Sequence, residues 1–213
     1  MTADPTAFLY PFIEAEERAT APLLGDLAAS ALRKLDESAD LQRSTIERCS
    51  EELGAAADAM AQRLELGAAL FAFGNGGSAT DAEAAARGFG AVGLRARNLT
   101  ADPAILTALA NDVGFELVFS RQLIAHAGHD DIALAFSTSG GSSNVVNGLV
   151  QARRLGLLTV AILGYDGGTV AADGLADHCL VVRSDSVHRI QESQDALRRR
   201  LTDLVIQRLR PRP

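Results

Sequence analysis

From residue 68 to the end of the chain, short apolar runs alternate with stretches of helical periodicity. The apolar runs lie at 68–73, 94–100, 132–136, 158–163 and 178–182. The helical stretches lie at 81–89, 103–111, 115–126, 144–155, just after Gly168, and at 187–209. Apolar runs between helices are typical of parallel strands that are covered on both faces. We therefore predict an α/β fold, a three-layer sandwich with about five parallel strands.

Two helical patterns precede the first strand. Apolar residues recur at helical spacing over 24–35, the polar segment DESAD follows, and a second apolar stripe runs over 46–64. Ser44 and Glu47 have the spacing of a capping box, which predicts that the second helix starts there. We expect an antiparallel helical hairpin over 23–66, continuous with a sandwich over 67–213 in a single domain. Residues 1–22 form an N-terminal extension whose aromatic residues favour docking on this domain or on a neighbouring subunit.

Composition narrows the class of protein. A net charge of −7 argues against nonspecific nucleic-acid binding, and the arginine-rich end is interpreted as the exposed face of the last helix. Lys34 is the only lysine and lies far in sequence from the glycine-rich loops, which disfavours Schiff-base chemistry. Cys49 and Cys179 lack metal-ligand spacing and are interpreted as core thiols in a reducing compartment. Without a membrane-spanning or signal segment, we expect a cytoplasmic protein with no membrane partner.

Two loops of small residues carry the candidate chemistry. Gly74–Ser78 reads GNGGS and Ser137–Asn144 reads STSGGSSN, and each loop joins a predicted strand to a predicted helix. Glycines let the main chain approach a ligand, hydroxyls donate hydrogen bonds, and the next helix offers free N–H groups, so the loops predict phosphate binding. The alternative interpretation of the second loop is a helix cap with turn chemistry, but a cap would need only one serine or asparagine. Neither a Walker A loop nor the dinucleotide fingerprint is complete, so we expect no cofactor.

With these loops in place, the chain resembles the sugar isomerase (SIS) domain, and within it the phosphoheptose isomerase group. Three further motifs carry the resemblance, namely Asp102 with Asn111–Phe115, the turn Gly164–Gly168, and Arg189–Glu192. The resemblance implies a flavodoxin-like sandwich, a homotetramer around a helical core, and sites shared between subunits. It also implies that a sugar phosphate is bound by Asn75, Gly76, Gly77, Ser78, Asp102, Ser137, Thr138, Ser139, Ser142 and Gln191.

The chain departs from the group where its chemistry is performed. The resemblance places a histidine and a glutamate on the helix after the first loop and a histidine two turns beyond the glutamine of the last helix. Ala84, Gly88 and Arg199 stand there, and His188 replaces an aspartate. Aldose–ketose isomerisation needs a positioned base and acid, and the zinc site seen in some members would keep only Gln191. We therefore predict that the usual isomerase mechanism and the metal site are both absent, and the catalytic residues stay unknown.

Three functions remain open on the sequence alone. The leading interpretation is a non-catalytic phosphosugar sensor or assembly subunit, because the loops are intact while the acid/base positions are not. The chain is also similar to the replication-initiator-associating SIS protein, which works by binding another protein. The alternative is an active isomerase for sedoheptulose 7-phosphate or a related sugar phosphate, which uses His188 or borrows residues from a catalytic paralogue in a hetero-oligomer. A scaffold with an empty pocket is the third.

Overall fold

The computed structural model describes residues 20–209. The chain divides into two compact units, 1–39 and 40–213, and each is described by itself. Most of the predicted N-terminal extension, residues 1–19, lies outside the described part. Within 20–209, no helix has both the length and the apolar character needed to cross a membrane.

A five-stranded parallel sheet forms the centre of the second unit. Its strand order is β2-β1-β3-β4-β5, and every neighbouring pair is parallel. The strands are β1 (Leu70–Phe73), β2 (Ala96–Asn98), β3 (Ile132–Ser137), β4 (Leu158–Gly164) and β5 (His178–Val182). All five coincide with the apolar runs, so the predicted α/β fold is confirmed.

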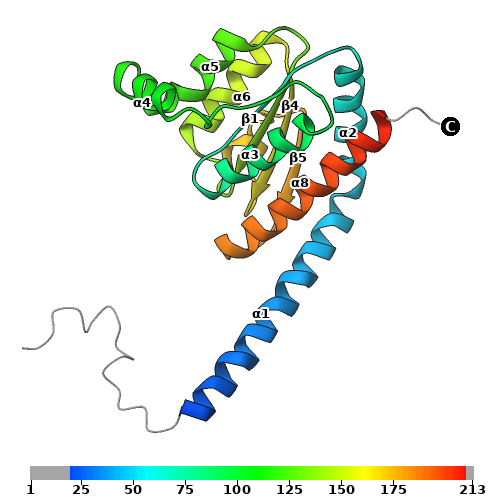
Figure 1. Ribbon diagram of the computed structural model, residues 1–213, viewed down its shortest axis with the longest axis vertical. Helices are drawn as coiled ribbons and strands as arrows, with labels where there is room; N and C mark the ends of the chain where they lie inside the picture. Colours follow the sequence, from blue (N-terminus) through cyan, green and yellow to red (C-terminus); the bar gives the residue numbers. More distant parts are fainter. Residues whose placement is uncertain (1–19, 210–213) are drawn as a thin grey trace, which may run out of the picture. The chain divides into compact units, whose positions relative to one another are not determined.

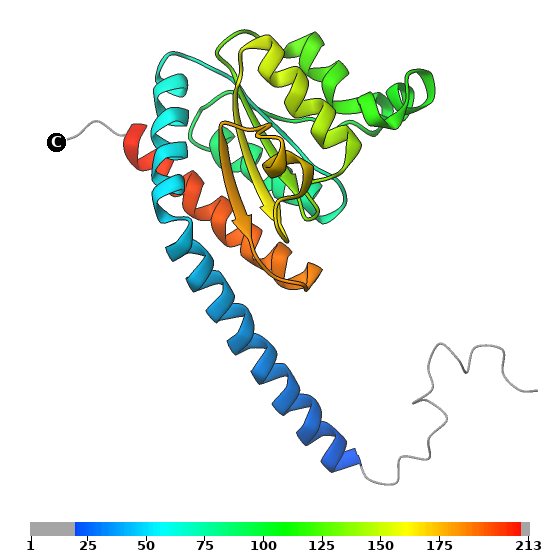
Figure 2. The same cartoon turned by 180° about the vertical axis from the view of Figure 1, so that it is seen from behind.

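Helices cover both faces of the sheet, as Figures 1 and 2 show from opposite sides. Side chains alternate between the faces, because Leu70 and Ala72 of β1 enter one apolar cluster while Phe71 and Phe73 enter the other. The first cluster is closed by α2 (Ser50–Glu65), α3 (Gly77–Gly90) and α8 (Val187–Leu209). The second is closed by α4 (Pro103–Asp112), α5 (Val118–His126), α6 (Ser143–Leu155) and α7 (Gly168–Ala172), and the short 3-10 helix η1 (Phe115–Leu117) directly precedes α5. This is the expected three-layer sandwich.

The two expected N-terminal helices are present, but they do not form a hairpin. Helix α1 covers Thr20–Arg48, and main-chain hydrogen bonds continue past its end, from Cys49 N to Thr45 O (2.9 Å) and from Leu53 N to Cys49 O (2.8 Å). From Asp40 onward, the chain therefore runs on in one helical direction into α2. The polar segment at 36–40 contains neither glycine nor proline, so it extends the helix. The predicted capping box is wrong, since the Ser44 hydroxyl donates to Leu41 O inside α1.

Candidate functional site

The two glycine- and serine-rich loops lie side by side at one end of the sheet. The first follows β1 and the second follows β3, and these strands are neighbours. The strand order reverses at this pair, because β2 lies on one side of β1 while β3, β4 and β5 follow on the other. Open α/β sheets bind ligands at the carboxyl ends of the strands where the order reverses. The fold thus brings together the loops that the sequence singled out.

Each glycine of the first loop has its own reason to lack a side chain. A Cβ at Gly74 would lie 2.7 Å from Ser78 O and 2.8 Å from Phe136 O. Gly76 has a φ of +55°, and no atom lies within 4 Å of its Cβ position. A Cβ at Gly77, the first residue of α3, would overlap the Gln191 amide. The space beside Gly76 is therefore open, and Gln191 of α8 lies against the start of α3.

The second loop uses its hydroxyl groups in two different ways. Ser137 Oγ accepts a hydrogen bond from Gly140 N (3.0 Å), and Ser139 Oγ accepts one from Gly141 N (3.2 Å). Both hydroxyls keep their own proton for donation. Within residues 20–209, the hydroxyls of Thr138 and Ser142 have no hydrogen-bond partner. The loop therefore combines two hydroxyls that shape the turn with two that are unengaged.

The amino end of α6 adds main-chain donors to this loop. The first hydrogen bond of the helix runs from Val146 N to Ser142 O, so the amides of residues 143–145 have no acceptor within the helix. Ser142 caps α6 without a side-chain bond. Free N–H groups at a helix start favour an anion. Neither loop contains lysine or arginine, so the charge of an anion would be met by dipoles.

The turn after β4, Gly164–Gly168, packs directly against the second loop. A Cβ at Gly140 would overlap Gly167 O, and a Cβ at Gly168 would overlap Ser139 O. Val170 N donates to Gly140 O (3.0 Å). Gly140, Gly167 and Gly168 all have positive φ, at +61°, +91° and +52°. The turn and the loop are packed main chain against main chain, which leaves no room for a side chain at Gly140 or Gly168.

A pair of amides joins the first loop to the second. Asn75 Nδ2 donates to Asn144 Oδ1 (2.8 Å), and Asn144 Nδ2 donates to Asn75 Oδ1 (2.9 Å). Asn144 is only 2% exposed. Asn75 was predicted to reach a sugar hydroxyl, and its amide is already engaged within the protein. The two amides fix the spacing between the loops.

Helix α8 is anchored at the same end of the sheet by a residue that sequence reasoning missed. The Gln194 side chain is fully buried and donates to Ser137 O (3.2 Å) and Ile162 O (3.1 Å). It holds α8 to the ends of β3 and β4, three residues beyond Gln191. An amide among the apolar residues Ile190, Leu197 and Leu201 of the helix was the signal that could have revealed it.

Asp102 caps the amino end of α4 after β2. One carboxylate oxygen, Oδ1, accepts hydrogen bonds from Ala104 N (2.8 Å) and Ile105 N (3.3 Å). The side chain is exposed, and β2 is the neighbour of β1 on the side away from the second loop. The residue thus has a structural task that is separate from its predicted role in sugar binding.

A buried carboxyl group lies one turn into α3. Asp81 is 8% exposed, and burial raises its pKa to about 6. The nearby carboxylate of Asp195 on α8 raises the pKa further, while Arg198 lowers it. Arg198 is itself bound to Asp195, with Nε 3.1 Å from Oδ1. The interface between α3 and α8 therefore holds two carboxyl groups and one guanidinium group.

The positions that depart from the resemblance occur on α3 and α8. Ala84 and Gly88 are half-buried and one turn apart on α3, while Arg199 on α8 is 71% exposed and pairs with Asp195 (2.7 Å). His188 is exposed at the start of α8. Glu83, beside Ala84, forms an exposed ion pair with Arg87 (2.8 Å), so it is a surface charge.

These residues do not fit a zinc ion. Alanine and glycine have no donor atom, and arginine stays protonated, so Gln191 alone would remain as a ligand. Within 20–209, no cluster of three histidine, cysteine or carboxylate side chains is placed to hold a metal. The arrangement can bind an anion through hydroxyl and amide donors, and its loop residues include no side chain suited to general-base work.

Comparison with known proteins places this architecture in a family. Residues 35–164 match the SIS domain. Phosphoheptose isomerase from Aquifex aeolicus is 40% identical over 177 residues, which cover 79% of this chain and 91% of that protein. Phosphoheptose isomerase from Sulfurimonas denitrificans is 43% identical over 138 residues, which cover 62% and 70%.

Solved structures of phosphoheptose isomerases also resemble this chain. The structure of phosphoheptose isomerase GmhA from Neisseria gonorrhoeae superposes with a TM-score of 0.81 at 33% identity, over 85% of this chain and 99% of that one. A phosphoheptose isomerase from Francisella tularensis gives 0.79 at 30% identity, over 84% and 98%. With a SIS match over more than half of its length and these relatives, the chain belongs to the SIS domain family and is similar to its phosphoheptose isomerases.

Proposed function

We propose that this chain binds a phosphorylated sugar between its two loops and lacks the proton-transfer groups of the isomerases that it resembles. The observation that carries the proposal is the loop 137–144, which joins unengaged hydroxyls to the free amides of α6. Such a site suits the phosphate of a sugar phosphate. Asn75, Asp102 and Gln191 would contact the sugar, and Gly76 would let it approach the main chain.

The proposed loss of catalysis rests on chemistry at three positions. Moving a proton between adjacent carbons requires a base and an acid within hydrogen-bond reach of the substrate. Ala84 and Gly88 cannot serve as either, and Arg199 is directed to Asp195. In this proposal the chain senses a metabolite or serves as a subunit of an assembly.

An active isomerase is the competing proposal, and the identity to phosphoheptose isomerases, near 40%, favours it. His188 is exposed three residues before Gln191 and is the best candidate for a replacement base. In a hetero-oligomer, a catalytic paralogue would supply the missing groups instead. Both versions predict turnover, and they differ in whether this chain alone is sufficient.

Binding is tested first, by thermal denaturation and calorimetry with sedoheptulose 7-phosphate. We expect the sugar phosphate to raise the melting temperature and the unphosphorylated sugar to leave it unchanged. Ser142→Ala and Ser139→Ala should weaken binding, whereas Ser50→Ala on α2 serves as the matched control. No stabilisation by any member of a sugar phosphate panel would instead support a scaffold whose pocket stays empty.

Turnover is tested by following the same sugar phosphate by NMR, with the Aquifex aeolicus phosphoheptose isomerase as a positive control. We expect binding without conversion. Conversion that disappears in His188→Ala would overturn the proposal in favour of a replacement mechanism. Conversion only in the complex purified from its native cells, with a second SIS subunit identified by mass spectrometry, would establish the hetero-oligomer.

The remaining parts of the proposal concern assembly and location. We propose a homotetramer, or a hetero-oligomer with a paralogue, that works in the cytoplasm and has a protein partner but no direct contact with nucleic acid. Free thiols at Cys49 and Cys179 support a reducing compartment. The division into an extension at 1–22 and a single domain at 23–213 remains a prediction.

A further inference from the structure

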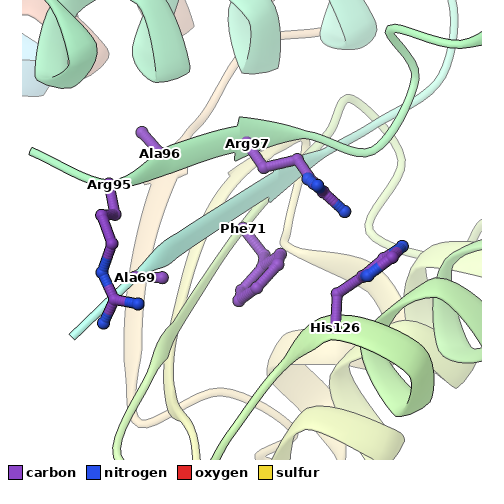
Figure 3. Close-up of a pocket in the computed structure, with 6 residues that line it drawn as sticks. All are labelled: Ala69, Phe71, Arg95, Ala96, Arg97 and His126. Carbon is purple, nitrogen blue, oxygen red and sulfur yellow. The ribbon is translucent and has the colours of Figure 1, made fainter.

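A second polar pocket opens beside the edge of the sheet, away from the two loops. It has a volume of about 280 Å³ and is lined by Ala69, Phe71, Arg95, Ala96, Arg97 and His126 (Figure 3). Ala69 precedes β1 and His126 ends α5, whereas the first loop begins only after Phe73 at the other end of β1. The pocket therefore belongs to the amino-terminal half of the strands and is separate from the phosphosugar site.

The lining of this pocket has positive charge and no acidic group. Arg95, Arg97 and His126 contribute all of its ionisable side chains, in a chain with 27 acidic and 20 basic residues. Arg95 donates to the carbonyl of Gly67, which fixes its guanidinium group. Among the described residues, Arg97 and His126 have no ion-pair partner within 4 Å. Two basic groups thus face the cavity without a counter-charge.

The register of β2 explains why the Arg97 side chain faces the cavity. In the sheet Arg97 is paired with Phe71, so their side chains project from the same face. Phe71 is 4% exposed and contributes an apolar side chain to the lining, beside the edge strand β2. Figure 3 shows the side chains of Arg97 and His126 converging on one side of Phe71, with Arg95 on the other side.

The carboxylate that is bound to Ala69, a residue of the lining, does not neutralise the pocket. Asp131 precedes β3 and is 9% exposed. Its Oδ1 accepts a hydrogen bond from Ala69 N (2.7 Å), and its Oδ2 accepts one from Gly128 N (2.8 Å). Both oxygens are therefore bound to main-chain amides, one of them in the lining of the pocket, and neither lies within ion-pair distance of the two arginines.

We propose that this pocket is a second anion-binding site that takes a compact phosphate-bearing molecule. Arg97 would bind two phosphate oxygens in the fork geometry of guanidinium, with His126 and Arg95 as further donors. The volume, about 280 Å³, is just below the range of about 300–1,000 Å³ for ligand pockets, which suits a small phosphorylated metabolite better than a nucleotide. The site stands independently of whether the loops bind a sugar phosphate.

The test is a titration of the full-length, isotope-labelled protein with inorganic phosphate, followed by NMR at constant ionic strength. Amide signals of 95–97 and 126 report on the pocket, and those of 138–143 report on the second loop. We expect the pocket signals to saturate in the wild type. In Arg97→Gln their midpoint should rise by about tenfold or more, the effect of losing a charge-assisted contact. The loop signals should titrate as before.

Arg154→Gln is the matched control, because it removes the same charge from an exposed position on α6 that does not line the pocket. Its pocket signals should titrate as in the wild type. The proposal is overturned if millimolar phosphate leaves the pocket signals of the wild type unmoved. It is equally overturned if Arg97→Gln and Arg154→Gln weaken binding to the same extent, since bulk charge would then explain the effect. Unchanged loop signals in Arg97→Gln confirm that the variant is folded.

Discussion

At the scale of single residues, the candidate site depends on buried polar groups as much as on the hydroxyls of its loops. Asp81, Asn144 and Gln194 are each less than 10% exposed and lie just behind the loops. Buried polar groups are costly unless they are paired, so each is expected to influence stability more than its size suggests. Two of them allow a direct measurement.

Asp81→Asn should change how stability depends on pH. The folded protein keeps the Asp81 proton up to a pKa of about 6, whereas the unfolded chain releases it near 3.8. Between these values the folded state holds more protons, so its free energy of unfolding falls as pH rises from about 4 to 6. Above that window the loss is about 3 kcal/mol at most, from a shift of about two pH units.

Urea unfolding near pH 5 and near pH 7.5 measures this effect. The wild type should lose stability between the two pH values by more than Asp81→Asn does, and the variant should be the more stable protein at the higher pH. Asp203→Asn removes an exposed carboxylate from α8 and provides the control. Equal pH dependence in the wild type and Asp81→Asn would show that the Asp81 carboxyl group is ionised without penalty.

Asn144→Ala should destabilise the protein and weaken sugar phosphate binding together. It removes both hydrogen bonds to Asn75 and leaves that amide without its partner, at a cost of about 1–3 kcal/mol. Asn147→Ala, one turn along α6, loses a single hydrogen bond to Glu116 O (3.0 Å) and should cost less. Chemical denaturation and calorimetry measure the two effects, and an intact affinity in Asn144→Ala would mean that the loops do not need this link.

At the scale of elements, the contact between the second loop and the turn after β4 is the least tolerant part of the site. Gly140→Ala would place a side chain at a φ of +61° and against the main chain of Gly167, which cannot yield as a flexible side chain would. We expect a loss of more than about 2 kcal/mol and a large loss of sugar phosphate affinity.

Gly141→Ala is a closely matched control for this change. The atoms nearest its Cβ position, Ser139 O and Thr169 Oγ1, are 3.9 Å away, which is an ordinary van der Waals distance. Its stability should stay within about 0.5 kcal/mol of the wild type. Thermal denaturation separates the two variants, and similar melting temperatures would show that the loop moves away from the turn at little cost.

The elements also show which parts of the structure a sequence can predict. Local signals are sufficient for the strands, because parallel strands such as β3 and β4 are apolar on both faces and end at turn residues. The two loops lie side by side because β1 and β3 pair. Several of their glycines stand where one main chain contacts another. The hairpin was wrong because a polar segment can be helical, and only contacts decide whether a helix turns back.

The sequence pattern does not predict the surroundings of a side chain when those surroundings come from distant elements. Asp81 was recognised as part of a motif, but its raised pKa arises from burial and from Asp195, more than one hundred residues away. The apolar neighbours of Gln194 hint at its burial, but the carbonyl groups that it bonds lie on β3 and β4, 57 and 32 residues away in the sequence. The same holds for the Arg97 pocket, since an arginine in a short edge strand gives no sign of the cavity beside it.

At the scale of the whole molecule, the amino-terminal part of α1 carries an apolar face that no other described residue of its own unit covers. Leu24, Leu27, Leu32 and Leu35 are each more than half exposed. At 100° per residue they lie within an arc of about 140° on the helix surface. A stripe of four exposed leucines is more than isolated surface residues would need, and it indicates a protein interface.

This stripe leads to a prediction about assembly. The wild type should elute with about four times the mass of the 22.4 kDa chain when size exclusion is combined with light scattering. Leu27→Glu with Leu35→Glu should dissociate the assembly, because charges would be buried without partners. Arg33→Glu places the same residue on the opposite side of the helix, about 180° from Leu24, and should leave the mass unchanged. If the double variant keeps the wild-type mass, α1 is not the interface, and any subunit-shared site must be built from other surfaces.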